Sequence, residues 1–162
     1  MSDNDSFDDE ILNVFRIFSL HQLRFIVIGG FATNFNGFQR VTADLDILIE
    51  DSLINRQVLR KCMAELDLGD YAQIETMPFI PGWTEFRLNS GFPLDIMTEI
   101  KGLDKSNFQE YYEQSTRLSL MGIEVPVLSL DHLLQSKRAS ARPKDLLDIE
   151  ELEKIKKLKG ER

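Results

Sequence analysis

The chain has 162 residues, of which 43% are hydrophobic and 28% charged, as is usual for one soluble globular domain. Its formal net charge of −8 argues against the broad positive surface with which proteins grip nucleic acid. No apolar run approaches the roughly 18–20 residues of a membrane span, and Cys62 is the only cysteine, so we expect a cytoplasmic protein without membrane contact or internal disulfide.

The first part of the chain predicts helices and buried strands in alternation. Apolar residues recur at helical spacing near the start, and an apolar tetrapeptide at 25–28 is stopped by Gly29-Gly30. Ser52 offers an N-cap for a later amphipathic helix. The expected elements are a helix over 7–20, a strand over 25–28, a short helix or turn over 31–37, a strand over 44–49 and a helix over 53–66.

The second part predicts a hairpin followed by helices. The prolines and glycines of 69–82 indicate irregular structure, and Asn89-Ser90-Gly91 is typical of a hairpin turn between strands over 83–88 and 92–100. Beyond it we expect a helix over 106–115, a short strand or turn at 125–127, a helix capped by Ser129 and a last helix from Pro143. The expected fold is α/β (α+β): residues 1–162 form one domain with a small mixed sheet flanked by helices, and the helices from about 129 complete the core.

Three aspartates carry the strongest chemical signal. Asp44 and Asp46 stand two residues apart on a predicted strand, so both side chains leave the same face. Asp95 is a lone acid among apolar residues on another predicted strand, which a hairpin or sheet neighbour would bring beside the pair. Carboxylates grouped in this way repel one another unless they bind a hard divalent cation. We therefore expect a metal site for phosphoryl chemistry.

The glycine pair adds a candidate phosphate contact. Gly29 and Gly30 end a strand and open a possible helix, where backbone N–H groups can approach a phosphate closely. A plain tight turn is the alternative, whereas the spacings of a dinucleotide-binding turn and of a P-loop are both missing. Together with the aspartates, the glycine pair points to a nucleoside triphosphate.

These residues resemble the nucleotidyltransferase superfamily typified by DNA polymerase beta. The signature is a hydrophobic-Gly-Gly turn, a spacer and an Asp-x-Asp flanked by apolar residues, matched here by Ile28-Gly29-Gly30 and Asp44-Leu45-Asp46-Ile47. Leu94-Asp95-Ile96 has the form of the third acidic motif.

The chain is most similar to the small bacterial AbiEii-type and minimal nucleotidyltransferases. Two stretches carry this likeness, Gly29-Gly30-Phe31-Ala32 and Arg40-Val41-Thr42-Ala43-Asp44, together with a late basic and acidic set of Lys137, Arg142, Lys144, Asp145 and Asp148. The resemblance spans roughly residues 25–149.

The resemblance implies a role for each matching residue. Asp44, Asp46 and Asp95 would bind Mg²⁺, or Mn²⁺ in its place, and Asp95 would also act as general base. Gly29 and Gly30 would hold a nucleoside triphosphate, for which ATP is the first candidate. Lys137 would neutralise phosphate charge.

Several of these residues also have a plainer interpretation. Arg40 and Thr42 either contact the nucleotide or only decorate a loop, and Lys137 lies in a basic stretch that most simply forms a solvated helix face. His21 and His132 are far apart and are expected to be surface or capping residues rather than zinc ligands. Trp83 and the phenylalanines are expected in the core.

The leading hypothesis is an enzyme that moves a nucleoside monophosphate from the triphosphate to a hydroxyl and releases pyrophosphate. The acceptor would be a small molecule or a protein hydroxyl, since no dedicated nucleic-acid-binding domain is expected. The alternative is a non-catalytic nucleotide-binding module that acts through a partner protein, as in toxin–antitoxin or phage-defence pairs. A metal-dependent phosphohydrolase is disfavoured, because such enzymes usually use more histidines than the two available here.

Overall fold

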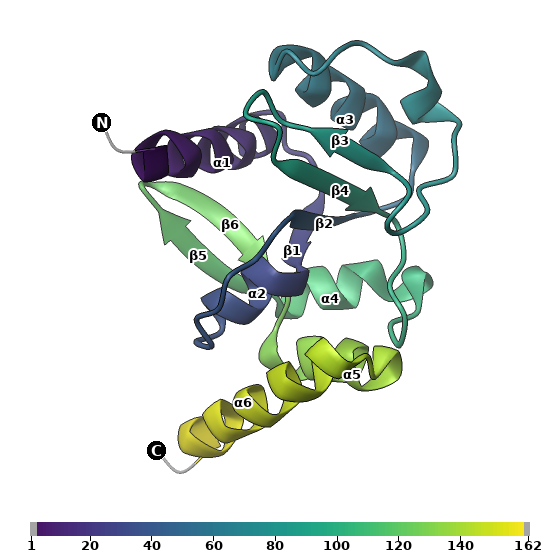
Figure 1. Cartoon of the computed structure of the whole chain (residues 1–162). Coiled ribbons are helices and arrows are strands. Elements are labelled where there is room, and N and C mark those ends of the chain that lie inside the picture. The colour runs from purple at the N-terminus through teal and green to yellow at the C-terminus, as the bar shows by residue number, and fades with distance from the viewer. Residues whose placement is uncertain (1–2, 161–162) are drawn as a thin grey trace.

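The computed structural model describes residues 3–160, with side chains from residue 8 onwards (Figure 1). Its elements in chain order are α1 (Asp3–Leu20), β1 (Phe25–Ile28), α2 (Gly29–Phe35), β2 (Leu45–Ile49), α3 (Leu53–Glu65), η1 (Ala72–Glu75), β3 (Glu85–Arg87), β4 (Pro93–Met97), η2 (Lys105–Asn107), α4 (Phe108–Gln114), β5 (Thr116–Leu120), β6 (Ile123–Val127), α5 (Leu130–Ser140) and α6 (Pro143–Gly160). The mixed sheet flanked by helices that the sequence predicts is confirmed.

The six strands form one mixed sheet in the order β3-β4-β2-β1-β6-β5. At its centre β2 lies between β1, which is antiparallel to it, and β4, which is parallel to it. The C-terminal end of β1 therefore lies beside the N-terminal ends of β2 and β4. Register pairs Asp46 with Ile28 on one side and with Asp95 on the other.

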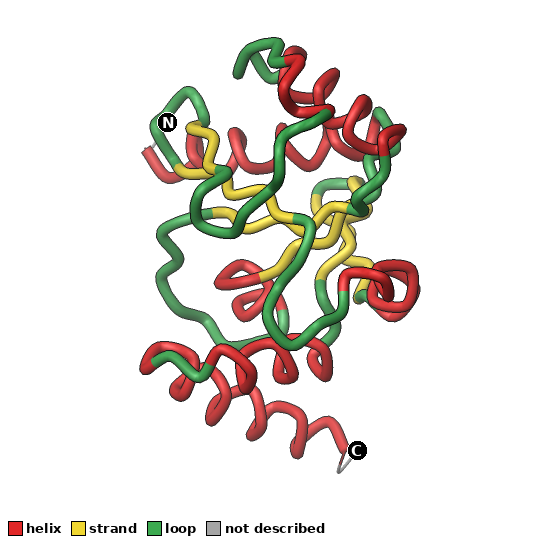
Figure 2. Tube along the Cα trace, turned by 90° about the vertical axis from the view of Figure 1, so that its right-hand side faces the viewer, coloured by secondary structure: helices red, strands yellow, loops and turns green. Residues whose placement is uncertain are grey.

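Helices lie on either side of the strands. Figure 2 shows the strands at the centre with helices above and below, and in Figure 1 α1 and α3 lie in the upper part while α5 and α6 form a pair at the bottom. Phe25 of β1 stacks on Phe15 of α1 and meets Phe18 edge-on, with ring centroids 6.3 and 5.2 Å apart. Burying each such large side chain contributes about 1.5–3 kcal/mol.

The expected element order is confirmed, with several differences of detail. Helix α1 begins at Asp3, before the expected start, and α4 is shorter than the expected helix over 106–115. Strand β5 was not predicted. It forms a hairpin with β6 through Met121 and Gly122, both of which have positive φ.

Two expectations about single residues were wrong. Trp83 does not belong to the core: it is 84% exposed, on a turn closed by hydrogen bonds from the Trp83 and Thr84 N–H groups to the Ile80 carbonyl. His132 is not at the surface, since it is buried on α5 against the Tyr111 ring. The burial of His132 depends on its contact with Tyr111 of α4, which local sequence does not reveal.

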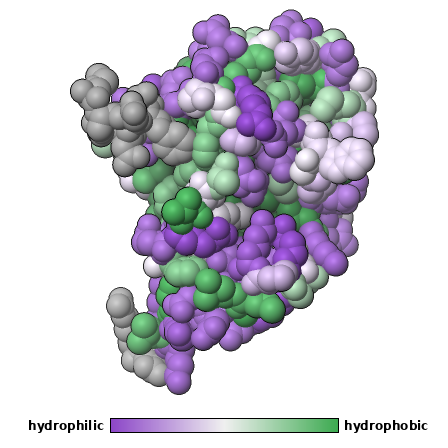
Figure 3. Space-filling model, viewed as in Figure 1, coloured by the Kyte–Doolittle hydropathy of each residue, from purple (hydrophilic) through white to green (hydrophobic). Residues whose placement is uncertain are grey.

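The hydropathy of the surface and of the helices is that of an ordinary globular domain. The face shown in Figure 3 is mostly hydrophilic, with an apolar strip over α6, where Leu146 and Leu147 are exposed. Within residues 3–160, none of the helices is both long and apolar enough to cross a membrane.

Candidate active site

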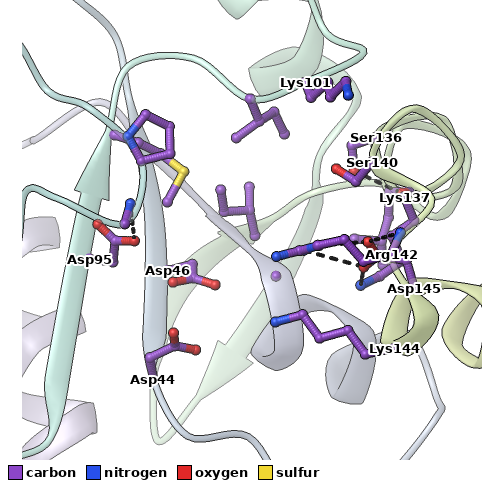
Figure 4. Close-up of a pocket in the computed structure, with 17 residues that line it drawn as sticks. Asp44, Asp46, Asp95, Lys101, Ser136, Lys137, Ser140, Arg142, Lys144 and Asp145 are labelled. Carbon is purple, nitrogen blue, oxygen red and sulfur yellow. Dashed lines mark hydrogen bonds and ion pairs between the residues drawn. The ribbon is translucent and has the colours of Figure 1, made fainter.

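A cleft of about 580 Å³ opens at the edge of the sheet where β1 ends and β2 and β4 begin (Figure 4). The α5–α6 connection forms its opposite wall. The lining side chains include acids, bases and apolar residues: Ile28, Gly29, Asp44, Asp46, Pro81, Gly82, Asp95, Met97, Ile100, Lys101, Leu133, Ser136, Lys137, Ser140, Arg142, Lys144 and Asp145.

The structure brings the three predicted aspartates to this cleft. Asp46 and Asp95 are register partners on the parallel strands β2 and β4, so their side chains leave the same face of the sheet. Asp44 directly precedes β2 and lines the same cleft. The sheet-neighbour arrangement expected for Asp95 is thus the one observed.

Burial and repulsion make the carboxylates of Asp46 and Asp95 costly to ionise. Desolvation by burial, followed by the charges of Asp44 and Asp95, raises the pKa of Asp46 to about 7. Burial also raises the pKa of Asp95, although the hydrogen bond from the Gly82 N–H opposes this. Binding of a proton or of a cation would reduce the repulsion between these negative charges.

Asp95 has one oxygen fixed and the other unused. Oδ2 accepts a hydrogen bond from the Gly82 N–H at 3.0 Å, whereas Oδ1 is buried and has no hydrogen-bond partner among the described residues. A buried carboxylate oxygen without a partner is unfavourable unless a ligand supplies one. Asp95 lines a cleft that it shares with two further carboxylates, so the donor set suits a hard divalent cation.

The aspartates do not form a finished metal site. Among the side chains of residues 8–160, no group of three or more His, Cys, Asp or Glu is arranged to hold a metal ion. The charges of Asp44 and Asp95 act on Asp46, but the three carboxylates do not converge on one point.

The glycine pair is required by close packing at the start of α2. Gly29 has a φ of +66°, and a Cβ there would lie closer than 3.0 Å to the Asp46 carboxylate. A Cβ at Gly30 would approach the Thr42 hydroxyl equally closely. Gly29 lines the cleft, whereas Gly30 is buried against the loop before β2. The glycines thus allow Asp46 and Thr42 to lie against the backbone at the end of β1.

Arg40 and Thr42 are held by contacts within the protein and do not line the cleft. The Arg40 guanidinium grips Asp148 through Nε, 2.8 Å from Oδ1, and through Nη2, which donates to Oδ2 at 2.9 Å. The Thr42 hydroxyl donates to the Asp44 carbonyl at 3.0 Å, which fixes the approach to β2. Their nucleotide contact stays a prediction, and the contacts seen here are structural.

Lys137 lines the cleft but does not form a solvated helix face. It is only 6% exposed, and its Nζ donates to Asp148 Oδ2 at 2.8 Å and lies 3.8 Å from Asp145 Oδ1. Asp148 therefore receives both Lys137 and Arg40 in a buried ion network. The lysine charge is neutralised inside the protein, which weakens the expectation that Lys137 neutralises phosphate.

Two basic residues to which the sequence motifs gave no role in the site, Arg142 and Lys144, reach the cleft from the α5–α6 connection. Arg142 and Lys144 point toward Asp44 and Asp46 in Figure 4. The chain reverses between α5 and α6 at Ala141, whose φ is +47°, and this reversal turns the following residues to the cleft. Their basic charge was visible in the sequence, but only the helix–helix turn shows where it is presented.

Comparison with known proteins is consistent with this geometry. A family model described as a nucleotidyltransferase of unknown function (DUF6036) matches residues 7–161. No curated protein matches.

Two solved structures share the fold. A candidate nucleotidyltransferase from Thermotoga maritima (TM1012) is 17% identical, with a TM-score of 0.59 over 100% of this chain and 97% of that one. The lincosamide antibiotic adenylyltransferase LnuA, bound to lincomycin, is 18% identical, with a TM-score of 0.58 over 91% of this chain and 96% of that one.

Proposed function

Because the chain belongs to this family of nucleotidyltransferases, we propose that it transfers a nucleoside monophosphate from a nucleoside triphosphate to a hydroxyl group and releases pyrophosphate. ATP is the expected donor. Asp44, Asp46 and Asp95 are the proposed ligands of a divalent cation, Mg²⁺ or, in its place, Mn²⁺.

One observation carries this proposal: the register that sets Asp46 beside Asp95 at the mouth of a cleft, with Asp95 Oδ1 buried and unpartnered. An ordinary solvated acidic pair would keep its oxygens in water. Since the three carboxylates do not converge in this structure, cation binding requires their side chains to reorient. Bound there, a divalent cation would supply charge neutralisation for the phosphates.

Residues of the chain would position the reactants and remove the proton from the acceptor hydroxyl. The acceptor oxygen forms a bond to the α-phosphorus while the bond from that phosphorus to the bridging oxygen of pyrophosphate breaks. Asp95 takes the hydroxyl proton, and its raised pKa suits a group that must accept one. The hydrogen bond from the Gly82 N–H to Asp95 Oδ2 holds the carboxylate in place. Gly29, without a side chain, lets the Asp46 carboxylate lie against the backbone at the end of β1, where the triphosphate is proposed to bind.

We propose that the acceptor is a small hydroxylated compound, with a protein hydroxyl as the second candidate. The cleft of about 580 Å³ has the size of a small-molecule site. LnuA, which shares the fold, is an adenylyltransferase of lincosamide antibiotics, and this supports a small acceptor. The net charge of −8 argues against a nucleic-acid acceptor.

The test is to incubate the purified chain with labelled triphosphates, MgCl₂ and a panel of hydroxylated acceptors that includes lincomycin. We expect pyrophosphate release and transfer of label by the wild type, and loss of both in Asp46→Asn and Asp95→Asn. Release of orthophosphate would instead indicate a phosphohydrolase. Binding of ATP without turnover would favour the non-catalytic module with a protein partner. Undiminished binding of nucleotide and metal by Asp44→Ala/Asp46→Ala would refute the assignment of those residues.

A further inference from the structure

We propose that Arg142 and Lys144, on the α5–α6 connection, bind the β- and γ-phosphates of the nucleotide donor and stabilise the departing pyrophosphate. This inference rests on the proposed function. It moves the phosphate contact from Lys137 and Arg40 to two residues that the structure presents to the cleft.

The cations around the cleft differ in what they are already bound to. Lys137 is buried and forms an ion pair with Asp148. Arg40 pairs with the same carboxylate and does not line the cleft. Lys101 lines the cleft but lies well apart from the aspartates in Figure 4. Arg142 and Lys144 are exposed and point toward the aspartates in that view. Arg142 is also paired with an acid, Asp145, but its side chain remains 58% exposed.

Position and charge indicate an anion between the two walls. Arg142 and Lys144 line the same cleft as Asp44 and Asp46 and point toward them in Figure 4, so the two walls of the cleft carry opposite charges. No ion pair directly joins either cation to Asp44, Asp46 or Asp95 among the described residues. A polyphosphate whose cation is held by the aspartates would fill that space and pair with both cations.

Lys144 stands where a lysine is electrostatically unfavourable for the helix. It lies in the first turn of α6, whose N-terminal end carries partial positive charge. Asp145 offsets part of this cost, but its carboxylate is engaged with Arg142. An unfavourable charge turned toward a cleft is better explained by a ligand than by a solvated helix face.

A buried ion network holds the cationic wall in place. Asp145, which is 1% exposed, accepts from the Arg142 backbone N–H at 3.1 Å and from its Nε at 2.8 Å. Asp148, equally buried, ties Lys137 of α5 and Arg40 of the loop before β2 to α6. Arg142 is thus held in place before a phosphate binds, and the connection that carries Lys144 is anchored on both sides.

The side of the cleft on which Arg142 and Lys144 lie indicates where the β- and γ-phosphates bind. In Figure 4 Asp95 lies on one side of Asp46, and Arg142 and Lys144 lie on the other. If Asp95 receives the acceptor proton, the α-phosphorus lies near Asp46 and the leaving pyrophosphate extends toward the cations. Negative charge accumulates on that group as the bond breaks, where a guanidinium and an ammonium stabilise it.

The inference is tested by calorimetric titration with ATP, inorganic tripolyphosphate and AMP in the presence of MgCl₂. The variant Lys144→Met removes the ammonium but keeps the aliphatic stem. Lys159→Met, at the other end of α6, is the matched control because it makes the same charge change far from the cleft. We expect Lys144→Met to weaken ATP and tripolyphosphate about 10- to 100-fold, with AMP changed less than about 3-fold. Arg142→Lys keeps the charge and should lose affinity only in part.

Each outcome decides between the inference and the function on which it rests. ATP affinity in Lys144→Met equal to that of Lys159→Met, or an equal loss for ATP and AMP, would overturn the phosphate assignment. If the phosphate assignment failed but Asp46→Asn still abolished pyrophosphate release, the proposed function would be retained without this inference. A wild-type chain that binds neither ATP nor tripolyphosphate would overturn both. Thermal unfolding of each variant separates lost binding from a lost fold.

Discussion

Replacing Asp46 by asparagine should stabilise the metal-free protein at neutral and alkaline pH. Asp46 carries a charge that burial and the neighbouring Asp44 and Asp95 make costly. Asparagine has nearly the same shape and removes that charge while fitting the space against Gly29. A functional residue that destabilises the empty site is expected where ligand binding has been favoured over stability.

The magnitude follows from the pKa of Asp46, which rises from 3.8 to about 7 on folding. Below pH 3.8 the carboxyl is protonated in both states and costs nothing. Between pH 3.8 and about 7 the unfolded chain releases the proton first, so stability falls as pH rises, and above about 7 the penalty is complete. The shift corresponds to at most about 4 kcal/mol, and partial solvent contact reduces the expected gain in Asp46→Asn to about 2–4 kcal/mol. For a domain of this size that is a rise in Tm of roughly 5–15 °C.

The assay is thermal unfolding in EDTA at a series of pH values from 4 to 8. The difference between Asp46→Asn and wild type should be largest near pH 8 and should vanish near pH 4. Asp51→Asn is the control of opposite sign, because the hydrogen bond from Arg56 lowers the pKa of Asp51 and its loss should slightly destabilise. An Asp46→Asn protein no more stable than wild type at pH 8 would show that the carboxylates do not repel as described. Adding MgCl₂ should narrow the gap by stabilising only the wild type.

Three further changes test the scaffold. Asp148→Asn should destabilise by about 3–5 kcal/mol in urea unfolding, because it removes the counter-ion of the buried Lys137 and the partly exposed Arg40. Asp131→Asn, at an exposed ion pair, should cost less than about 1 kcal/mol, and equal losses in the two variants would contradict the network. Gly29→Ala should lower both stability and nucleotide affinity, whereas Gly122→Ala, with positive φ but open space, should cost only about 1 kcal/mol and leave binding intact. Burial raises the pKa of the Cys62 thiol to about 12, so a thiol reagent should modify it only on unfolding, and rapid reaction of the folded chain would argue against this packing.

The sequence was sufficient to predict features that depend on local periodicity. Strand spacing of two placed Asp44 and Asp46 on one face, and the apolar setting of Asp95 indicated a second buried strand. The pairing of β2 with β4 was expected only as one option, because strand order depends on long-range packing rather than on either segment alone. Strand β5 escaped prediction because its sequence has only alternate leucines and much of it is exposed.

Lys137 and Trp83 were misjudged for different reasons. Lys137 looked solvated because a lysine is rarely buried without a counter-charge. Its counter-charge, Asp148, lies beyond the turn that separates α5 from α6, and helical periodicity within α5 does not reveal it. Trp83 looked like core because of its size, yet the short turn after Pro81 presents it to solvent. Such positions require the tertiary structure.

The two walls of the cleft also constrain where an acceptor enters. With the phosphates assigned to the side of Arg142 and Lys144, the attacking hydroxyl must approach in line from the opposite side, where Asp95 lies. That side is bounded by Pro81 and Gly82. Because the Gly82 N–H is bonded to Asp95, the segment that borders the acceptor also fixes the proposed base. Acceptor position and proton removal therefore depend on the same short turn, so changes in that turn should alter acceptor choice more readily than nucleotide binding.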